Sequence, residues 1–350
     1  MPAYISRPVT VLPAHKVTTA EILDDIRAHH PDHPHRGVLP RILASLKVES
    51  RFFTRPLAAP TVSGSADIGP RAQGAFADAV TLATQAAQQA LTTAGLGPAD
   101  VDAVVTTHST GWSVPNLEIH LIDALGLRPD VRRIALTTMA CAGGTQALIR
   151  AVDLVHARPG TRVLVAAAEV ISSVYSHTDT SIEAMIYKAL FGDSAAACIV
   201  SDQPYGPGLR VDSPNETFEY VLPNSLDRYS GRIAPDGLHF DSTKAALSAA
   251  DDVLPALLAW LGERARPDFV AIHPGSPRII TDTAAALGLD DQAARHSFDT
   301  LREEGNLGGV SVLRVLERAH THPPAAGASG VAVAYGPGFN MAAIHGTWQT

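Results

Sequence analysis

The sequence predicts an α/β protein built from two repeated halves. The same order of elements occurs twice along the chain: a strand, a glycine-rich helix start, a helix and two further strands. The length of 350 residues also suggests two domains, or one large duplicated domain with a substantial core. We place the boundary after residue 202, which gives an N-terminal half over 1–202 and a C-terminal half over 203–350.

Several predicted elements precede the repeat. Residues 10–56 read mostly as amphipathic helix. The histidine-rich run at 30–36 interrupts this pattern, and its two prolines keep the imidazoles off one helical face. We therefore interpret the run as a solvated loop between helices and not as a metal site. Residues 75–95 form an alanine-rich helix, which Gly95 and Pro98 terminate.

The first half of the repeat begins with a short buried strand at 101–107. It continues through the turn at 140–144 into a helix, and it ends with strands at 161–170 and 194–201. The helix carries an apolar stripe at the spacing of one helical face: Leu148, Ala151, Val152 and Val155.

The second half repeats this order after a linker rich in proline and glycine at 202–208. Its strand at 267–273 leads to a glycine-rich helix start at 305–310, and strands follow at 330–335 and 340–348. Its helix has the matching stripe: Val312, Val315, Leu316 and Ala319. Two αβα units packed about a pseudo-twofold axis bring the two helix starts together, with backbone N–H groups free to face a ligand.

Composition excludes several classes of function. The formal charge is −8, and the basic residues are scattered, which argues against a nucleic-acid interface and a polybasic membrane anchor. No run approaches the ~18 apolar residues of a membrane span, and the N-terminus does not resemble a secretory signal. Two cysteines, Cys141 and Cys198, are too few for a disulfide scaffold or a cysteine-based zinc cluster. We expect a soluble, cytoplasmic protein.

Cys141 is the candidate nucleophile. Superposing the halves places Cys141 and Asn306 at equivalent helix starts, and it places His273 where residues 107–108 end the first-half strand. A helix N-terminus and a hydrogen-bonded imidazole lower the pKa of a thiol from ~8.5 to ~3.5–7.5. The alternatives are a small buried Cys141, a structural His273 and an Asn306 that only caps a turn. Cys198 lies in an apolar strand, where we expect packing alone.

Five ordered motifs carry a resemblance to a known family. They are MACAGG at 139–144, LFGDSAA at 190–196, HPGSP at 273–277, GN at 305–306 and YGPGF at 335–339. In order and spacing, from about residue 11 to 348, the chain resembles bacterial type III polyketide synthases, in the chalcone-synthase-like branch of the thiolase superfamily. Ketoacyl synthase III, a single-condensation enzyme, also uses Cys, His and Asn, but its His is usually followed by Gln-Ala and it lacks the Gly-Pro-Gly turn.

The resemblance implies a thiolase-like five-layer αβαβα fold and a homodimer. It also implies an acyltransferase that condenses malonyl-CoA, or a substituted malonyl-CoA, onto an acyl-CoA starter held by Cys141, and then cyclises the chain to a pyrone or phenolic product. His273 would pair with the thiolate, and His273 and Asn306 would hydrogen-bond the malonyl thioester carbonyl. CoA thioesters are the substrates, and neither a metal nor a redox cofactor is expected.

The resemblance also implies substrate-binding residues. Phe191 and Phe240 match gatekeeping phenylalanines, and Ser109 stands where naphthalene-forming members carry a second cysteine, which points away from a tetrahydroxynaphthalene product. The other positions that it assigns to the cavity, the oxyanion turn and the CoA phosphates are Val174, Tyr187, Gly308, Gly336, Gly338 and Arg41, with Lys47 and Arg51 near the last. Val114, in the loop at 110–115, would reach across the dimer interface. The alternatives are ordinary core packing for the phenylalanines and solvated surface charge for the basic residues.

Two other functional classes remain open at this point. A papain-like Cys-His-Asn hydrolase also has its His and Asn downstream of the nucleophile, but the Cys-Gly-Ser-Cys-Trp signature is absent and Cys141 lies deep in the chain. A catalytically silent acyl-CoA-binding or scaffold protein on the same fold would carry the same motifs, since motifs alone do not give geometry.

Overall fold

A mixed sheet of 11 strands organises the computed structural model, which describes the backbone of residues 1–350 and all side chains except those of Lys244 and Leu247. Its main path runs β13-β14-β15-β9-β1-β8-β7-β5-β6, while β2 pairs with β8 and β10 with β15. The strands are β1 (Ala3–Ser6), β2 (Val9–Val11), β5 (Ala103–His108), β6 (Arg132–Thr137), β7 (Val163–Glu169), β8 (Ser194–Ser201), β9 (Gly208–Val211), β10 (Thr217–Val221), β13 (Phe269–Ile272), β14 (Ser329–Gly336) and β15 (Asn340–Gln349).

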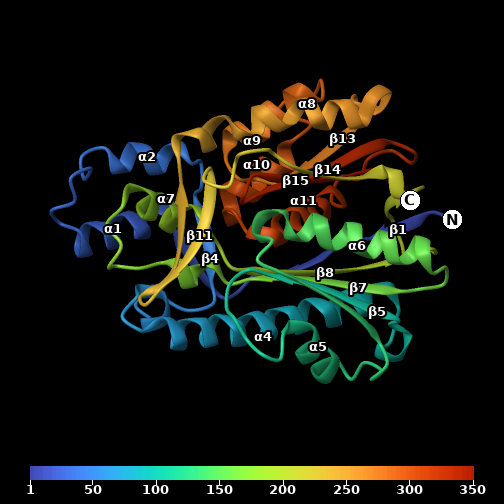
Figure 1. The fold of residues 1–350 in the computed structure, drawn as a ribbon, viewed down its shortest axis with the longest axis horizontal. Helices are drawn as coiled ribbons and strands as arrows, with labels where there is room; N and C mark the ends of the chain where they lie inside the picture. The colour runs from blue at the N-terminus through green and yellow to red at the C-terminus, as the bar shows by residue number, and fades with distance from the viewer.

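The helices lie in three layers about the two halves of this sheet (Figure 1). Moving up the view, α4 and α5 are followed by β5, β7 and β8, then by α6 and α11, then by β14 and β15, and finally by α8, α9 and α10. This order confirms the predicted five-layer αβαβα fold. The helices are α4 (Ile68–Ala94), α5 (Leu117–Leu125), α6 (Gly143–Ala157), α8 (Ala249–Leu261), α9 (Pro277–Ala286), α10 (Arg295–Glu304) and α11 (Ser311–Ala319).

The two repeated units share one strand pattern. In the first, β5 runs parallel to β7, and β7 runs antiparallel to β8. In the second, β13 runs parallel to β14, and β14 runs antiparallel to β15. The apolar stripes of α6 and α11 are buried in one shared core, between the two halves of the sheet. The central pair of helices therefore holds the repeats together, as the stripes predict.

The N-terminal region differs from the prediction of mostly helix. Only α1 (Thr19–His29) and α2 (Leu39–Ser45) are helical there, and β3 (His15–Thr18) pairs antiparallel with β4 (Ser50–Phe53). A strand this short forms only because it pairs with a segment distant in sequence, and the local pattern of apolar residues does not reveal that pairing. The histidine-rich loop is also less solvated than expected, because His30 and His33 are buried.

The fold also contains two further helices and a hairpin. They are α3 (Pro60–Ser63), α7 (Ile182–Leu190), and the hairpin of β11 (Tyr229–Ala234) and β12 (Gly237–Ser242). Among the described helices, none combines the length and the apolar character needed to cross a bilayer.

Candidate active site

Cys141 lies in a single 3₁₀ turn, Ala140–Ala142, that runs directly into α6. Its thiol borders a pocket with about 310 Å³ of empty space. The pocket is lined by Ser109, Thr110, Ala140, Cys141, Glu169, Ile171, Phe191, Tyr229, Phe240, Gly308 and Pro337. The predicted nucleophile is therefore partly exposed, at a cavity built from both halves of the chain.

The two helix starts meet at this pocket, as the repeat predicts. A Cβ atom built on Gly144 would lie 2.0 Å from the carbonyl oxygen of Gly309. Because that distance is far below van der Waals contact, only glycine lets the first turn of α6 approach the turn that begins α11. This close approach brings Asn306, just before the second turn, up to Cys141.

Asn306 contacts the Cys141 thiol with a fixed amide orientation. Its Nδ2 and its Oδ1 both lie 3.9 Å from Sγ, and Oδ1 also accepts a hydrogen bond of 2.9 Å from the backbone N–H of Gly308, so Nδ2 is the donor to the sulfur. Its backbone is also hydrogen-bonded: its N–H donates to the carbonyl of Leu190, and its carbonyl accepts from the N–H of Gly192. The GN and LFGD motifs are thus hydrogen-bonded to each other.

His273 directly follows β13, at the same end of the sheet. Its N–H donates to the carbonyl of Val333 on β14, and its ring is buried. Among the described residues, its Nδ1 has no hydrogen-bond partner. Further along β14, a Cβ on Gly336 would lie 3.0 Å from the Cβ of Ala142. The end of β14, beside His273, therefore abuts the turn that carries Cys141.

The pKa of the Cys141 thiol is raised, although a lowered pKa was expected. Burial, followed by the nearby Glu169 carboxylate, raises the pKa of Cys141 to about 12, although the Asn306 amide opposes this shift. Burial likewise lowers the pKa of His273 to about 3. A thiolate at Cys141 or an imidazolium at His273 is therefore unfavourable when either forms alone in this site.

Glu169 is a site residue that sequence reasoning missed. It ends β7, it is buried, and its Oε1 and Oε2 accept hydrogen bonds from the hydroxyl and N–H of Ser109, each at 3.1 Å. The Ser109 hydroxyl in turn accepts a bond of 2.7 Å from the N–H of Ala140, whose φ is +47°. Burial raises the pKa of Glu169 to about 7. The sequence signal that could have identified Glu169 is its position as a single acidic residue at the end of an apolar strand.

Aromatic rings form one wall of the pocket. Phe191 and Phe240 both line it, and their ring centroids lie 5.9 Å apart. Tyr187, at the end of α7, stacks on Phe191 at 5.4 Å. Tyr229 lines the pocket as well, and its role was not anticipated, because its place depends on the β11–β12 hairpin.

Some of the other residues predicted to shape the cavity line the pocket, and some do not. Gly308 lines the pocket, and Pro337 does so between Gly336 and Gly338. Val174 packs against the core cluster that includes Tyr187, and it is not among the residues that line the pocket.

The basic residues near α2 fall into two groups. Arg41 and Lys47 are exposed, as a contact to CoA phosphates would require. Arg51 corrects the expectation of a surface cation, because it is fully buried. Its guanidinium donates to the carbonyl of Ala189 and the hydroxyl of Thr19. Burial accordingly lowers the pKa of Arg51 to about 10.

Known proteins are similar to this chain in sequence. Residues 56–204 match the model of the N-terminal domain of chalcone and stilbene synthases, and residues 215–345 match that of the C-terminal domain. The 1,3,6,8-tetrahydroxynaphthalene synthase of Streptomyces griseus is 29% identical over 99% of this chain and 93% of its own length. Phloroglucinol synthase of Pseudomonas fluorescens is 29% identical over 97% of this chain and 98% of its own length.

Solved structures agree with these matches. Tetrahydroxynaphthalene synthase from Streptomyces coelicolor, a bacterial type III polyketide synthase, superposes with a TM-score of 0.92 at 30% identity over 99% of both chains. Germicidin synthase from the same organism, also a type III polyketide synthase, superposes with a TM-score of 0.90 at 29% identity over 99% of this chain and all of its own. The chain therefore belongs to the chalcone and stilbene synthase family of type III polyketide synthases.

Proposed function

We propose that the protein is an acyltransferase that loads an acyl-CoA starter onto Cys141 and extends it by repeated decarboxylative condensation with malonyl-CoA or a substituted malonyl-CoA. The observation that carries this proposal is the thiol of Cys141 at the pocket, 3.9 Å from the Nδ2 of an amide that Gly308 holds in place. A nucleophile beside a fixed neutral donor suits thioester chemistry.

In the loading step that we propose, Cys141 and His273 act together. The sulfur attacks the thioester carbonyl of acyl-CoA while its proton passes to the imidazole of His273, since burial disfavours either charge alone. The carbon–sulfur bond to CoA then breaks, and the CoA sulfur leaves with the proton that His273 held. The products are the Cys141 thioester and free CoA, and His273 is neutral again.

The extension step uses the fixed amide. Loss of CO2 from malonyl-CoA leaves an enolate, whose oxygen accepts hydrogen bonds from Asn306 Nδ2 and from His273. A preorganised donor of this kind lowers a barrier by about 2.7–4 kcal/mol. The enolate carbon attacks the acyl carbonyl on Cys141, and a new carbon–carbon bond forms as the sulfur departs. The lengthened chain remains attached to CoA, ready for reloading.

The pocket supports a pyrone or a phenolic ring as the product. Its wall includes the rings of Phe191, Phe240 and Tyr229, which favour an apolar chain. Ser109 contributes a hydroxyl that is already engaged with Glu169, and it supplies no second thiol. We therefore do not expect tetrahydroxynaphthalene, although the relatives include enzymes named for it.

Assembly, cofactors and location belong to the same proposal. In the loop at 110–115, Trp112 is 77% exposed and Val114 is 79% exposed, which supports burial of this loop in a homodimer. The steps above use only protein groups and CoA thioesters, so we propose that the reaction needs no metal or redox cofactor. The two free cysteines support action in the reducing cytoplasm.

Mass spectrometry of the products tests the function directly. Purified protein is given malonyl-CoA with a panel of acyl-CoA starters, and we expect pyrones or phenolic products that contain the starter. Cys141→Ala should reduce product formation about 10⁴-fold or more, because no acyl-enzyme can form. Cys198→Ala is the matched control, since its thiol is buried in β8 away from the pocket, and it should stay active.

The same experiment separates the alternatives. An intact, folded wild-type protein that forms no acyl-enzyme with any starter would identify a silent acyl-CoA-binding protein. A single condensation without further extension would identify a ketoacyl-synthase-like enzyme. Full product formation by Cys141→Ala would refute the assignment of the nucleophile.

A further inference from the structure

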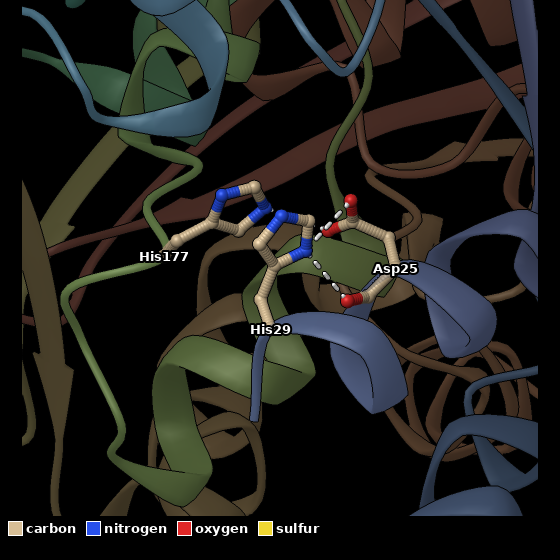
Figure 2. Close-up of side chains that lie close together, drawn as sticks. All are labelled: Asp25, His29 and His177. Carbon is tan, nitrogen blue, oxygen red and sulfur yellow. Dashed lines mark hydrogen bonds and ion pairs between the residues drawn. The ribbon is translucent and has the colours of Figure 1, made fainter. Parts of the chain in front are cut away.

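A cluster of metal-ligating side chains lies apart from the pocket. Asp25, His29 and His177 each offer one ligand atom, and these atoms all lie within 4.8 Å of one another (Figure 2). None of the three lines the active-site pocket. We propose that they form a binding site for one divalent transition-metal ion, with Zn²⁺ as the ion that fits the donors best.

The fold builds this cluster from two distant segments. Asp25 and His29 are one helical turn apart on α1, so they share a face of that helix. His177 comes from the segment between β7 and α7, where its backbone N–H donates to the carbonyl of Ser63 at 2.9 Å. The Nε2 of His177 lies 2.8 Å from Oδ2 of Asp25, and the Nδ1 of His29 lies 3.3 Å from Oδ1.

The carboxylate is positioned from outside the cluster. The hydroxyl of Tyr175 donates a hydrogen bond of 2.5 Å to Oδ2 of Asp25, and the Asp25 side chain is only 13% exposed. Outer hydrogen bonds that fix a ligand's orientation are a regular feature of metal sites. Asp25 is thus held in place whether or not an ion is bound.

The donor set selects the class of metal. Two imidazole nitrogens and one carboxylate oxygen suit Zn²⁺ and its neighbours Co²⁺, Ni²⁺ and Cu²⁺, whereas Mg²⁺ and Ca²⁺ prefer oxygen ligands throughout. Three protein ligands leave one tetrahedral position for water. Lys188 places a positive charge nearby, with its Nζ 3.1 Å from Nε2 of His30, so we expect a moderate affinity.

One rearrangement is required. The rings of His29 and His177 are stacked, with centroids 3.6 Å apart and planes 11° apart. Because an imidazole binds a metal within its own plane, two stacked rings cannot reach one ion together. His29 supplies the movement, since its side chain is 45% exposed and lies at the last residue of α1. The movement also breaks the hydrogen bond of 2.9 Å that its Nδ1 donates to the backbone carbonyl of Asp25. Metal binding should therefore unstack the pair and join α1 to the segment before α7.

Calorimetric titration of untagged, metal-free protein tests the site. We expect one Zn²⁺ per chain with a dissociation constant of about 10 µM or tighter, a raised melting temperature, and no comparable binding of Mg²⁺. His29→Ala and His177→Ala should each weaken Zn²⁺ binding at least tenfold. His35→Ala is the matched control, because it removes an exposed imidazole of the neighbouring loop and should bind Zn²⁺ normally.

A second measurement excludes binding at the catalytic thiol. The titration is repeated on Cys141→Ser, and Co²⁺ is used as a spectroscopic probe of nitrogen and oxygen ligation. Unchanged stoichiometry in Cys141→Ser, with visible Co²⁺ bands that disappear in His29→Ala, would support the site. Absence of saturable Zn²⁺ binding would overturn the proposal, as would Zn²⁺ binding that survives both His29→Ala and His177→Ala, or that is lost in Cys141→Ser or His35→Ala.

Discussion

The two glycine-rich turns at the pocket have equivalent places in the repeat, but they are held in different ways. The turn before α11 is joined to the LFGD motif by backbone bonds, since the N–H of Asn306 donates to Leu190 and its carbonyl accepts from Gly192. Within the turn, the N–H groups of Gly308 and Leu307 donate to the side chains of Asn306 and Ser311. The turn before α6 depends on a side chain, because the N–H of Ala140 donates to the hydroxyl of Ser109, which Glu169 holds.

The two kinds of support suit the different roles of the two turns in the proposed reaction. Asn306 must present one fixed donor throughout, so a rigid backbone cradle suits it. Cys141 must accept an acyl group and release it, and Ala140 before it has a φ of +47°, a conformation that costs about 1–3 kcal/mol for a residue other than glycine. The Ser109–Glu169 pair stabilises that conformation from one side.

Replacing Asn306 should give the largest effect among changes that leave the nucleophile in place. Asn306→Ala removes the amide that faces Sγ, so we expect malonyl-CoA decarboxylation and condensation to fall about 10²–10³-fold. Loading of the starter should change far less, because the attack by sulfur relies on His273. Rapid-quench mass spectrometry of the acyl-enzyme, set beside the rate of CO2 release, separates the two steps.

The comparison variant is Ser311→Ala, which removes a hydroxyl that lies 3.5 Å from Oδ1 and accepts the N–H of Leu307 at 2.9 Å, while the Gly308 N–H still fixes the amide. It should retain most of the activity. Equal loss of loading and condensation in Asn306→Ala would show that the backbone cradle serves the nucleophile as well, and the contrast between the two turns would fail.

Much of the fold followed from periodicity. The apolar stripes of the central helices and the strands that flank them predicted two repeated αβα units, because buried elements carry their pattern in the local sequence. The five-layer arrangement was implied by the resemblance to a known family. The short pair β3–β4 was missed, since each strand has only four residues and its partner lies some thirty residues away. The burial of Arg51 was missed for the same reason. Its sequence neighbours are typical of a surface segment, but its guanidinium donates to backbone carbonyls of distant segments.

The site was predictable only in part. Cys141, His273 and Asn306 stand at the turns that the repeat marks, and the structure brings Asn306 to the thiol of Cys141, whereas His273 is not among the residues that line the pocket. Their catalytic roles stay predictions. Glu169 and Tyr229 could not be assigned, because neither lies in a recognisable turn and each depends on tertiary packing. Residues 30–36 were interpreted as a loop and not as a metal site, which stays a prediction. The proposed metal ligands instead include the neighbouring His29, whose partner His177 lies far along the chain.

Glu169 offers a pH-dependent test of the side-chain-held turn. Burial raises the pKa of Glu169 from its ordinary 4.5 to about 7, so the native protein keeps a proton that the unfolded chain has lost. The free energy of unfolding should therefore fall as the pH rises from about 4.5 to about 7, by about 3 kcal/mol from this group. Glu169→Gln should remove this slope.

Urea unfolding of wild type and Glu169→Gln at pH 5 and pH 8 measures the difference. Asp193, whose pKa burial raises to about 6, contributes a slope of the same sign to both proteins and cancels. Glu263→Gln, at an exposed position, is the control and should follow wild type. Parallel pH profiles for wild type and Glu169→Gln would mean that Glu169 is ionised throughout this range in the native protein.

Ser109 should give the smallest effect, and it tests whether the Cys141 turn needs its support. Ser109→Ala leaves the N–H of Ala140 without its acceptor and leaves the Glu169 carboxylate with one donor fewer, at a cost of about 1–1.5 kcal/mol. If the support acts on the position of the sulfur, kcat should fall about 5–10-fold while KM for malonyl-CoA changes little. Ser109→Thr keeps the hydroxyl and should restore most of the rate. A fall in Ser109→Ala that appears only in KM, or a Ser109→Thr variant no better than Ser109→Ala, would show that Ser109 acts as a wall of the pocket and not as a support for the turn.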